Sequence, residues 1–105
     1  MDVIFHAHHA VMSPRLRRRA EQALARLADR LALPVDALVR FEQDGPGHRV
    51  EIVLTAPRRK PMIAEGRQRY AGSALTEALA RLETQIETSR RKRRARPRAP
   101  RGGRA

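Results

Sequence analysis

Two amphipathic helical stretches, separated by strand-like sequence, restrict the fold of this chain more than any other feature. The first follows Ser13 and Pro14, a typical N-cap and first helical residue, and stops before Pro34. Its apolar positions are Leu16, Ala20, Ala23, Leu24, Leu27 and Leu31. The second begins with Ser73 as its N-cap and runs to about Arg91. Its apolar positions are Leu75, Ala78, Leu79, Leu82 and Ile86. Each helix has a single apolar face, so each must be buried on one side only.

The sequence before and between the helices alternates as β-strands do. The predicted strands are residues 2–7, 36–43, 48–56 and 62–66. The turn sequences DGPG at 44–47 and PRRKP at 57–61 join the last three strands as antiparallel neighbours, and residues 67–72 are ambiguous between strand end and loop. The predicted fold class is α+β in the order β-α-β-β-β-α. The first two strands run parallel through a right-handed crossover, and both helices pack on one face of the four-stranded sheet. The other face stays partly exposed.

The positive charge is concentrated at the C-terminal end. The 105 residues carry 23 Lys and Arg against 11 Asp and Glu, a net charge of +12. Nine of these bases and none of the acids lie in residues 90–105, which leaves residues 1–89 with a net charge of +3. Residues 95–105 have no large apolar side chain, so they cannot bury surface to offset the entropy of ordering. We expect one domain, residues 1–94, followed by a disordered basic tail, residues 95–105.

A chain this basic favours a polyanionic partner, most often nucleic acid, with an anionic membrane surface as the other candidate. Arginine outnumbers lysine, which suits bidentate phosphate contact, although a GC-rich genome produces the same bias. The chain has few aromatic side chains on which bases could stack, namely one tyrosine, Tyr70, and two phenylalanines. Recognition is therefore expected to use the backbone and shape of a folded RNA.

Catalytic functions are disfavoured. The chain has no cysteine, which excludes disulfides, thiolate metal sites and cysteine catalysis. It has no Gly-rich phosphate loop, no nucleophile elbow and no carboxylate pair suited to acid–base chemistry. We expect no enzyme activity, no cofactor and no small-molecule substrate. The sequence has no apolar run of membrane-spanning length and no signal-peptide pattern, so we expect a cytoplasmic protein without a membrane partner.

The histidines are the only metal-ligand candidates. His6 and His8 share one face of the first predicted strand, and a third ligand would have to come from elsewhere, for which His48 is a candidate. Histidines without a carboxylate or cysteine partner are more often surface residues at a strand end. We therefore expect no metal site.

Basic side chains recur outside the tail. Arg15, Arg19, Arg26 and Arg30 form one stripe beside the apolar face of the first helix, with Arg18 flanking it. This stripe is either a surface that tracks phosphates or an ordinary solvated helix face. Further bases are Arg58, Arg59 and Lys60 in the turn at 57–61 and Arg67 and Arg69 after the next strand. Because these two groups fall at opposite ends of a hairpin, the sequence does not unite them in one patch.

These stretches together resemble the ribosome hibernation promoting factor family, also called the sigma-54 modulation or ribosome-associated inhibitor family. SPRLRRRAEQALARLADRL is similar to its first helix, and HRVEIVLTA with MIAEGRQRYAGSALTEALARLETQI is similar to its last two strands and second helix. The most specific piece is the AEG…YA pattern of Ala64, Glu65, Gly66, Tyr70 and Ala71. The resemblance covers residues 2 to about 94.

The resemblance implies a protein that binds the ribosomal RNA of the small subunit near the decoding region. There it would block messenger and transfer RNA and keep idle ribosomes silent. The RNA contacts that it implies are Arg15, Arg18, Arg19 and Arg26 on the first helix and Arg90, Arg91, Lys92, Arg93 and Arg94 at the end of the second. We add Arg58, Arg59, Lys60, Arg67 and Arg69 to this predicted RNA-binding set. The chain lacks the dimerisation domain of long members, so it resembles the short form, and we expect a monomer off the ribosome.

Two other functions fit the sequence. The αβββα part of the order also resembles the double-stranded RNA-binding domain, which reads A-form shape and phosphates, so a general binder of structured RNA is one alternative. A regulator that binds a protein partner through the exposed sheet face is the other, in keeping with the family's name as a sigma-factor modulator.

Overall fold

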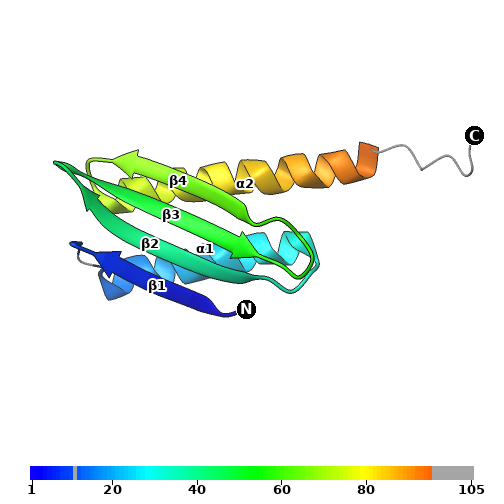
Figure 1. The fold of residues 1–105 in the computed structure, drawn as a ribbon, viewed down its shortest axis with the longest axis horizontal. Helices are drawn as coiled ribbons and strands as arrows, with labels where there is room; N and C mark the ends of the chain where they lie inside the picture. Colours follow the sequence, from blue (N-terminus) through cyan, green and yellow to red (C-terminus); the bar gives the residue numbers. More distant parts are fainter. Residues whose placement is uncertain (11, 96–105) are drawn as a thin grey trace, which may run out of the picture.

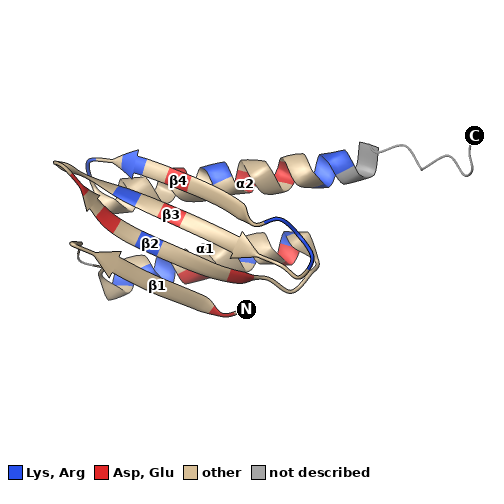
Figure 2. Ribbon diagram, in the orientation of Figure 1, with Lys and Arg blue, Asp and Glu red and all other residues tan. Residues whose placement is uncertain are grey.

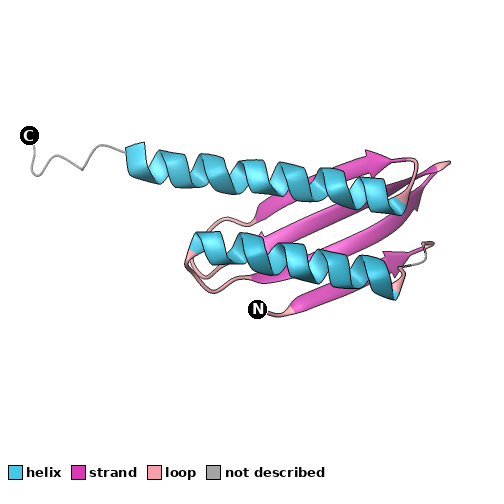
Figure 3. Ribbon diagram, turned by 180° about the vertical axis from the view of Figure 1, so that it is seen from behind, coloured by secondary structure: helices cyan, strands magenta, loops and turns pink. Residues whose placement is uncertain are grey.

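The elements of the chain follow the predicted order in a computed structural model that describes residues 1–10 and 12–95. They are β1 (Val3–His8), α1 (Pro14–Leu31), β2 (Asp36–Asp44), β3 (Gly47–Thr55), β4 (Met62–Gln68) and α2 (Ala71–Ala95). The four strands form one sheet in the order β1-β2-β3-β4, in which β1 and β2 are parallel and the other neighbours antiparallel. Both helices lie on one face of the sheet, as the two opposite views show (Figures 1 and 3). The α+β prediction is confirmed, while the predicted tail from residue 96 onward lies outside the described residues.

Helix α1 begins and ends as its sequence predicts. The Ser13 hydroxyl accepts a hydrogen bond from the backbone N–H of Leu16 at 3.1 Å, and Pro14 is the first helical residue. Ala32 adopts a left-handed conformation with φ of 54° just after the last turn, and Pro34 follows. The predicted apolar face of α1 is the one that packs on the sheet.

The core between the sheet and the helices is apolar throughout the described residues, with no polar or charged side chain buried there. The largest fully buried side chains include Phe41 and Ile52 from the sheet and Leu24, Leu75 and Leu82 from the helices. Every charged side chain of this part of the chain therefore lies at the surface. Most of these charges lie on the two outer faces of the molecule, one formed by helices and one by strands, and others lie in the turns and at the edge of β4.

The start of α2 differs from the prediction. Strand β4 continues to Gln68, and α2 begins at Ala71, so Ser73 is not the N-cap but lies in the first turn. The backbone N–H of Ala74 donates to the carbonyl oxygen of Tyr70 at 2.9 Å, which is the first helical bond. The Glu77 carboxylate of α2 accepts hydrogen bonds from the backbone N–H of Arg67 at 2.7 Å and from the Gln68 amide at 3.0 Å. These contacts between β4 and α2 outweigh the local preference of serine for a cap position. The helix also continues past the predicted end at Arg91 to Ala95.

Gly66 allows β4 to pack backbone to backbone against α2. A Cβ atom at this position would overlap the carbonyl oxygen of Ala74 and lie 2.7 Å from the backbone nitrogen of Ala78. Gly66 is buried, and its neighbour Ala64 is also small and buried. The AEG pattern therefore has a physical reason: only small residues fit where the strand crosses the helix.

We predict that Gly66→Ala destabilises the fold by about 2 kcal/mol, because backbone atoms of α2 cannot move aside as a flexible side chain could. Urea unfolding followed by circular dichroism measures this change. Gly72→Ala is the matched control. Its Cβ would meet nothing closer than 3.8 Å, so stability should stay the same or rise by up to about 1 kcal/mol. Equal stability of the two variants would contradict the close packing of β4 on α2.

Candidate nucleic-acid interface

Charged residues lie along the strands and both helices (Figure 2), and the two outer faces of the molecule differ in charge. On the sheet face, strand alternation places side chains opposite to the buried ones. The charged residues there are Asp36, Arg40, Glu42, Asp44, Arg49, Glu51, Glu65 and Arg67. With histidines neutral, these five acids and three bases give the sheet face a net charge of −2. Helix α1 on the other side carries six arginines against Glu21 and Asp29. The basic surface of the folded body is therefore on its helix side.

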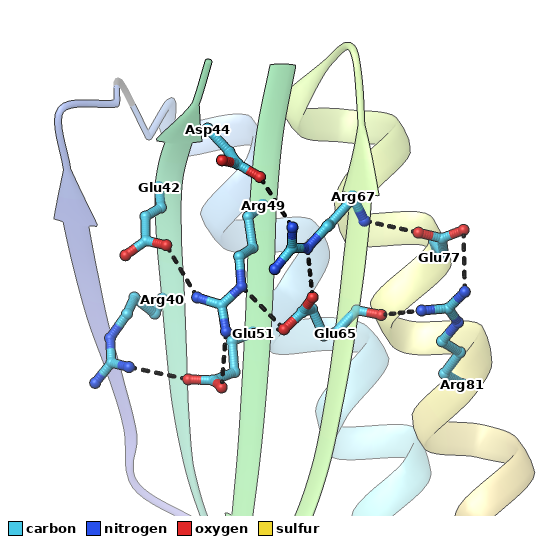
Figure 4. Close-up of polar contacts among 9 residues, drawn as sticks. All are labelled: Arg40, Glu42, Asp44, Arg49, Glu51, Glu65, Arg67, Glu77 and Arg81. Atoms are coloured by element: carbon cyan, nitrogen blue, oxygen red, sulfur yellow. Dashed lines mark hydrogen bonds and ion pairs between the residues drawn. The ribbon is translucent and has the colours of Figure 1, made fainter. Parts of the chain in front are cut away.

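The arginines of the sheet face are neutralised by an ion-pair network centred on Arg49 (Figure 4). The Arg49 guanidinium contacts Glu42 at 2.9 Å, Glu65 at 2.8 Å and Glu51 at 3.2 Å. The hydrogen bond that Arg49 donates to Glu65 is the largest cause of a raised pKa for Arg49. Arg40 pairs with Glu51 at 2.9 Å on the same face. These side chains are occupied by protein carboxylates rather than free to meet phosphate.

Arg67, one of the predicted RNA contacts, belongs to this network. Its guanidinium lies 2.6 Å from Glu65 and 3.3 Å from Asp44. The bonds from Arg49 and Arg67 lower the pKa of Glu65 below its ordinary value. A role for Arg67 in RNA binding stays a prediction, and its two carboxylate partners make it a weaker candidate than the helix arginines.

The outer edge of β4 is closed by side chains of α2. The Glu77 carboxylate accepts from the N–H of Arg67, while the Arg81 guanidinium donates to the carbonyl oxygen of Glu65 at 2.9 Å. One turn further on, the Gln85 amide donates to the carbonyl oxygen of Ile63 at 2.6 Å. Four residues of a helix advance about 6 Å along its axis, and two residues of a strand advance about 6.6 Å. Every fourth residue of α2 therefore stays level with every second residue of β4 over this length. The i, i+4 spacing of these three polar residues was the available sequence signal for this contact, but it does not reveal the strand that they meet.

Three arginines of the first-helix stripe, Arg19, Arg26 and Arg30, line a groove between the helices. Arg19 donates to the carbonyl oxygen of Gly72 at 3.2 Å and to the Thr76 hydroxyl, and Arg30 pairs with Glu83 at 2.9 Å. These two arginines tie α1 to α2. Arg26 lines the same groove between them.

Among the exposed bases of α1, Arg17 lies over the Phe5 ring at 4.9 Å, whereas Arg15, Arg18 and Arg26 are best placed to bind an anion. No carboxylate in residues 1–10 or 12–95 lies within ion-pair distance of any of them. The structure thus divides the predicted first-helix set into arginines that hold the helices together and arginines that are available to a partner.

The basic turn at 57–61 lies across a hollow from the C-terminal part of α2. Helix α2 runs past the end of the sheet on the side where this turn lies (Figure 1). A hollow of about 530 Å³ separates them, with Arg59 and Met62 on one side and Thr88, Ser89 and Lys92 of α2 on the other. The turn and the end of the helix therefore form a second basic cluster, which the sequence did not indicate. Arg90 also lies on this part of α2 and sits 3.5 Å from Glu87.

Other predicted contacts lie elsewhere or cannot be placed. Arg67 and Arg69 are at the opposite end of β4 from the basic turn, as the hairpin geometry predicted. Arg91 is exposed on α2. Arg93 and Arg94 belong to the helix, but their side chains lie outside the described residues.

A family model described as sigma 54 modulation protein / S30EA ribosomal protein matches residues 3–94. The chain belongs to this family. The family is one of ribosome-associated factors and is not a known family of enzymes. No curated protein matches this family member.

Two solved structures share the fold of this family member. The Protein Y N-terminal domain of Thermus thermophilus is 24% identical, with a TM-score of 0.73 over 85% of this chain and 99% of that one. A ribosomal subunit interface protein from Coxiella burnetii is 17% identical, with a TM-score of 0.73 over 88% of this chain and 100% of that one.

His48 is not a third metal ligand beside His6 and His8. The strand register places His6 and His8 on the open sheet face, whereas His48 lies on the helix side with the core residues of β3. The Nδ1 atom of His48 is 2.9 Å from the carbonyl oxygen of Arg69. Within the described residues, no three His, Asp or Glu side chains form a group that could hold a metal ion.

Among the same residues, no helix is long and apolar enough to cross a membrane.

We predict that Glu65→Gln lowers the free energy of unfolding by about 1 kcal/mol at pH 7, because it removes the charge that Arg49 and Arg67 share. The folded-state pKa of Glu65 is depressed, so its stabilising effect is present above the ordinary glutamate pKa and is lost as the pH falls through the lower, folded-state value. The difference between wild type and variant should therefore shrink in acid. Chemical unfolding at pH 7 and pH 3 measures it.

Glu21→Gln, at an exposed position of α1, is the control and should change stability little at either pH. A Glu65→Gln defect of the same size at both pH values would contradict an electrostatic role for the network.

Proposed function

We propose that this chain is a cytoplasmic, ribosome-associated hibernation factor that docks its helix layer on the ribosomal RNA of the small subunit near the decoding region. It acts by occupying space that messenger and transfer RNA need, and it performs no chemistry. The observation that carries the proposal is the separation of charge between the two faces of a family member: unpaired arginines on α1 and a sheet face with a net charge of −2.

The helix layer supports this role because its cations are available and its geometry is fixed. Arg15, Arg18 and Arg26 project from one rigid helix, and bonds from Arg19 and Arg30 hold that helix against α2. Fixed spacing allows several phosphates of a folded RNA to be met at once, which distinguishes a docking surface from diffuse attraction. The cluster of Arg59 and Lys92 extends the basic surface toward the end of α2.

We assign different roles to the body and the tail. Residues 1–94 recognise the site, and residues 95–105 add charge that strengthens binding to any RNA. Residues 96–105 contain four arginines and no acid. Each phosphate contact contributes about 0.7 to 0.9 to the slope of log affinity against log salt concentration, so the two roles can be measured separately.

We predict that Arg15→Gln, Arg18→Gln and Arg26→Gln together lower affinity for purified small subunits at least about tenfold and reduce the salt slope by about 2. Arg19 and Arg30 are left intact because they tie the helices together. The measurement is equilibrium binding of labelled protein to small subunits and, separately, to a duplex RNA, each at several salt concentrations. The triple variant should lose the preference for subunits over duplex.

Deletion of residues 96–105 is the charge control, since it removes four arginines without touching the helices. It should lower affinity for both RNAs by a similar factor and keep the preference for subunits. Loss of that preference on tail deletion alone, with the triple variant unchanged, would reverse the assigned roles. Equal wild-type affinity for subunits and duplex would favour the general RNA-binding alternative.

A further inference from the structure

An apolar row crosses the open face of the sheet. Ile4, Leu38, Val53 and Ile63 are direct neighbours in the strand register, one from each strand, and all point away from the helices. The two end members are 57% and 50% exposed, which makes Ile4 and Ile63 two of the most exposed large apolar side chains of the described residues. Strands lie about 4.8 Å apart, so the row is about 14 Å long.

Acidic side chains outnumber basic ones beside this row. Asp36 lies next to it on one side, and the adjacent row on the other side holds Glu51 and Glu65 together with Arg40, which pairs with Glu51 at 2.9 Å. The face as a whole has a net charge of −2 in a chain of net charge +12. An exposed apolar stripe with carboxylates on both sides fits a partner that presents an apolar strip between basic residues.

We propose that the apolar row is a docking surface for a basic protein, and that on the ribosome this face binds a ribosomal protein while the helix face binds RNA. The inference rests on the proposed function, since a helix layer docked on RNA leaves the sheet face pointing toward other components. Charge disfavours the alternative occupants: RNA phosphates would meet a net negative surface, and so would the same face of a second copy.

The test uses isosteric substitutions at the two exposed ends of the row. Ile4→Thr with Ile63→Thr makes the row polar, whereas Ile4→Val with Ile63→Val keeps it apolar, and threonine and valine have the same shape and both favour strands. We expect the Thr pair to bind purified small subunits about tenfold more weakly than the Val pair. The salt slope should be unchanged because no phosphate contact is lost. Affinity for a duplex RNA, which contains no protein, should be equal for the two pairs. Thermal unfolding checks that both pairs are folded.

A photocrosslinker identifies the occupant directly. With benzoylphenylalanine in place of Ile63, irradiation of the complex with small subunits should give a product that protease removes and ribonuclease does not, joined to a ribosomal protein. A crosslink to RNA, a crosslink to a second copy, or no crosslink at wild-type affinity would each overturn the inference. So would equal subunit binding by the Thr and Val pairs. Failure of the wild-type protein to bind small subunits at all would instead overturn the proposed function.

Discussion

The packing of two helices against one face of the sheet is the constraint on which the rest of the structure depends. Its tightest point is Gly66, where β4 and α2 meet backbone to backbone, and the core around it contains only apolar side chains in the described part of the chain. Because nothing polar is buried in that part of the chain, the charges there lie on the outer faces, at the edges and in the turns. Hydrogen bonds from Glu77, Arg81 and Gln85 close the edge of β4 and hold α2 in register with that strand.

The two faces use their arginines in different ways. On the sheet, Arg40, Arg49 and Arg67 are held by carboxylates of neighbouring strands, so their charge contributes to the fold and not to an anionic partner. On the helix side, Arg19 and Arg30 bind α2, and Arg15, Arg18 and Arg26 remain available. A count of basic residues cannot distinguish these groups, whereas ion pairing can. The sheet face also carries the apolar row of Ile4, Leu38, Val53 and Ile63.

Local sequence patterns were sufficient for the fold but not for the site. Helical spacing, the Ser13–Pro14 cap and the two turn sequences determined the element order, because each depends on neighbours in the chain. The start of α2 was predicted wrongly at Ser73, because side-chain bonds between Glu77 and β4 act across the fold and override a local capping preference. Sequence patterns also could not predict the ion pairs of Arg67, which depend on strand register, or the placement of Arg59 and Lys92 around one hollow, which depends on the length of α2. The family resemblance, carried by the AEG…YA pattern, is confirmed by the family match over residues 3–94.

We propose that the helix face, and not the sheet face, binds ribosomal RNA. Because the chain has no cysteine, a single introduced cysteine can carry an iron chelate that cleaves nearby RNA by hydroxyl radicals. The two probe positions are Gln22→Cys, in the groove between the helices, and His6→Cys, exposed on the open face of the sheet. On small subunits, we expect strong cleavage near the decoding region from position 22 and weak cleavage there from position 6. Strong cleavage from position 6 with none from position 22 would contradict docking through the helix face.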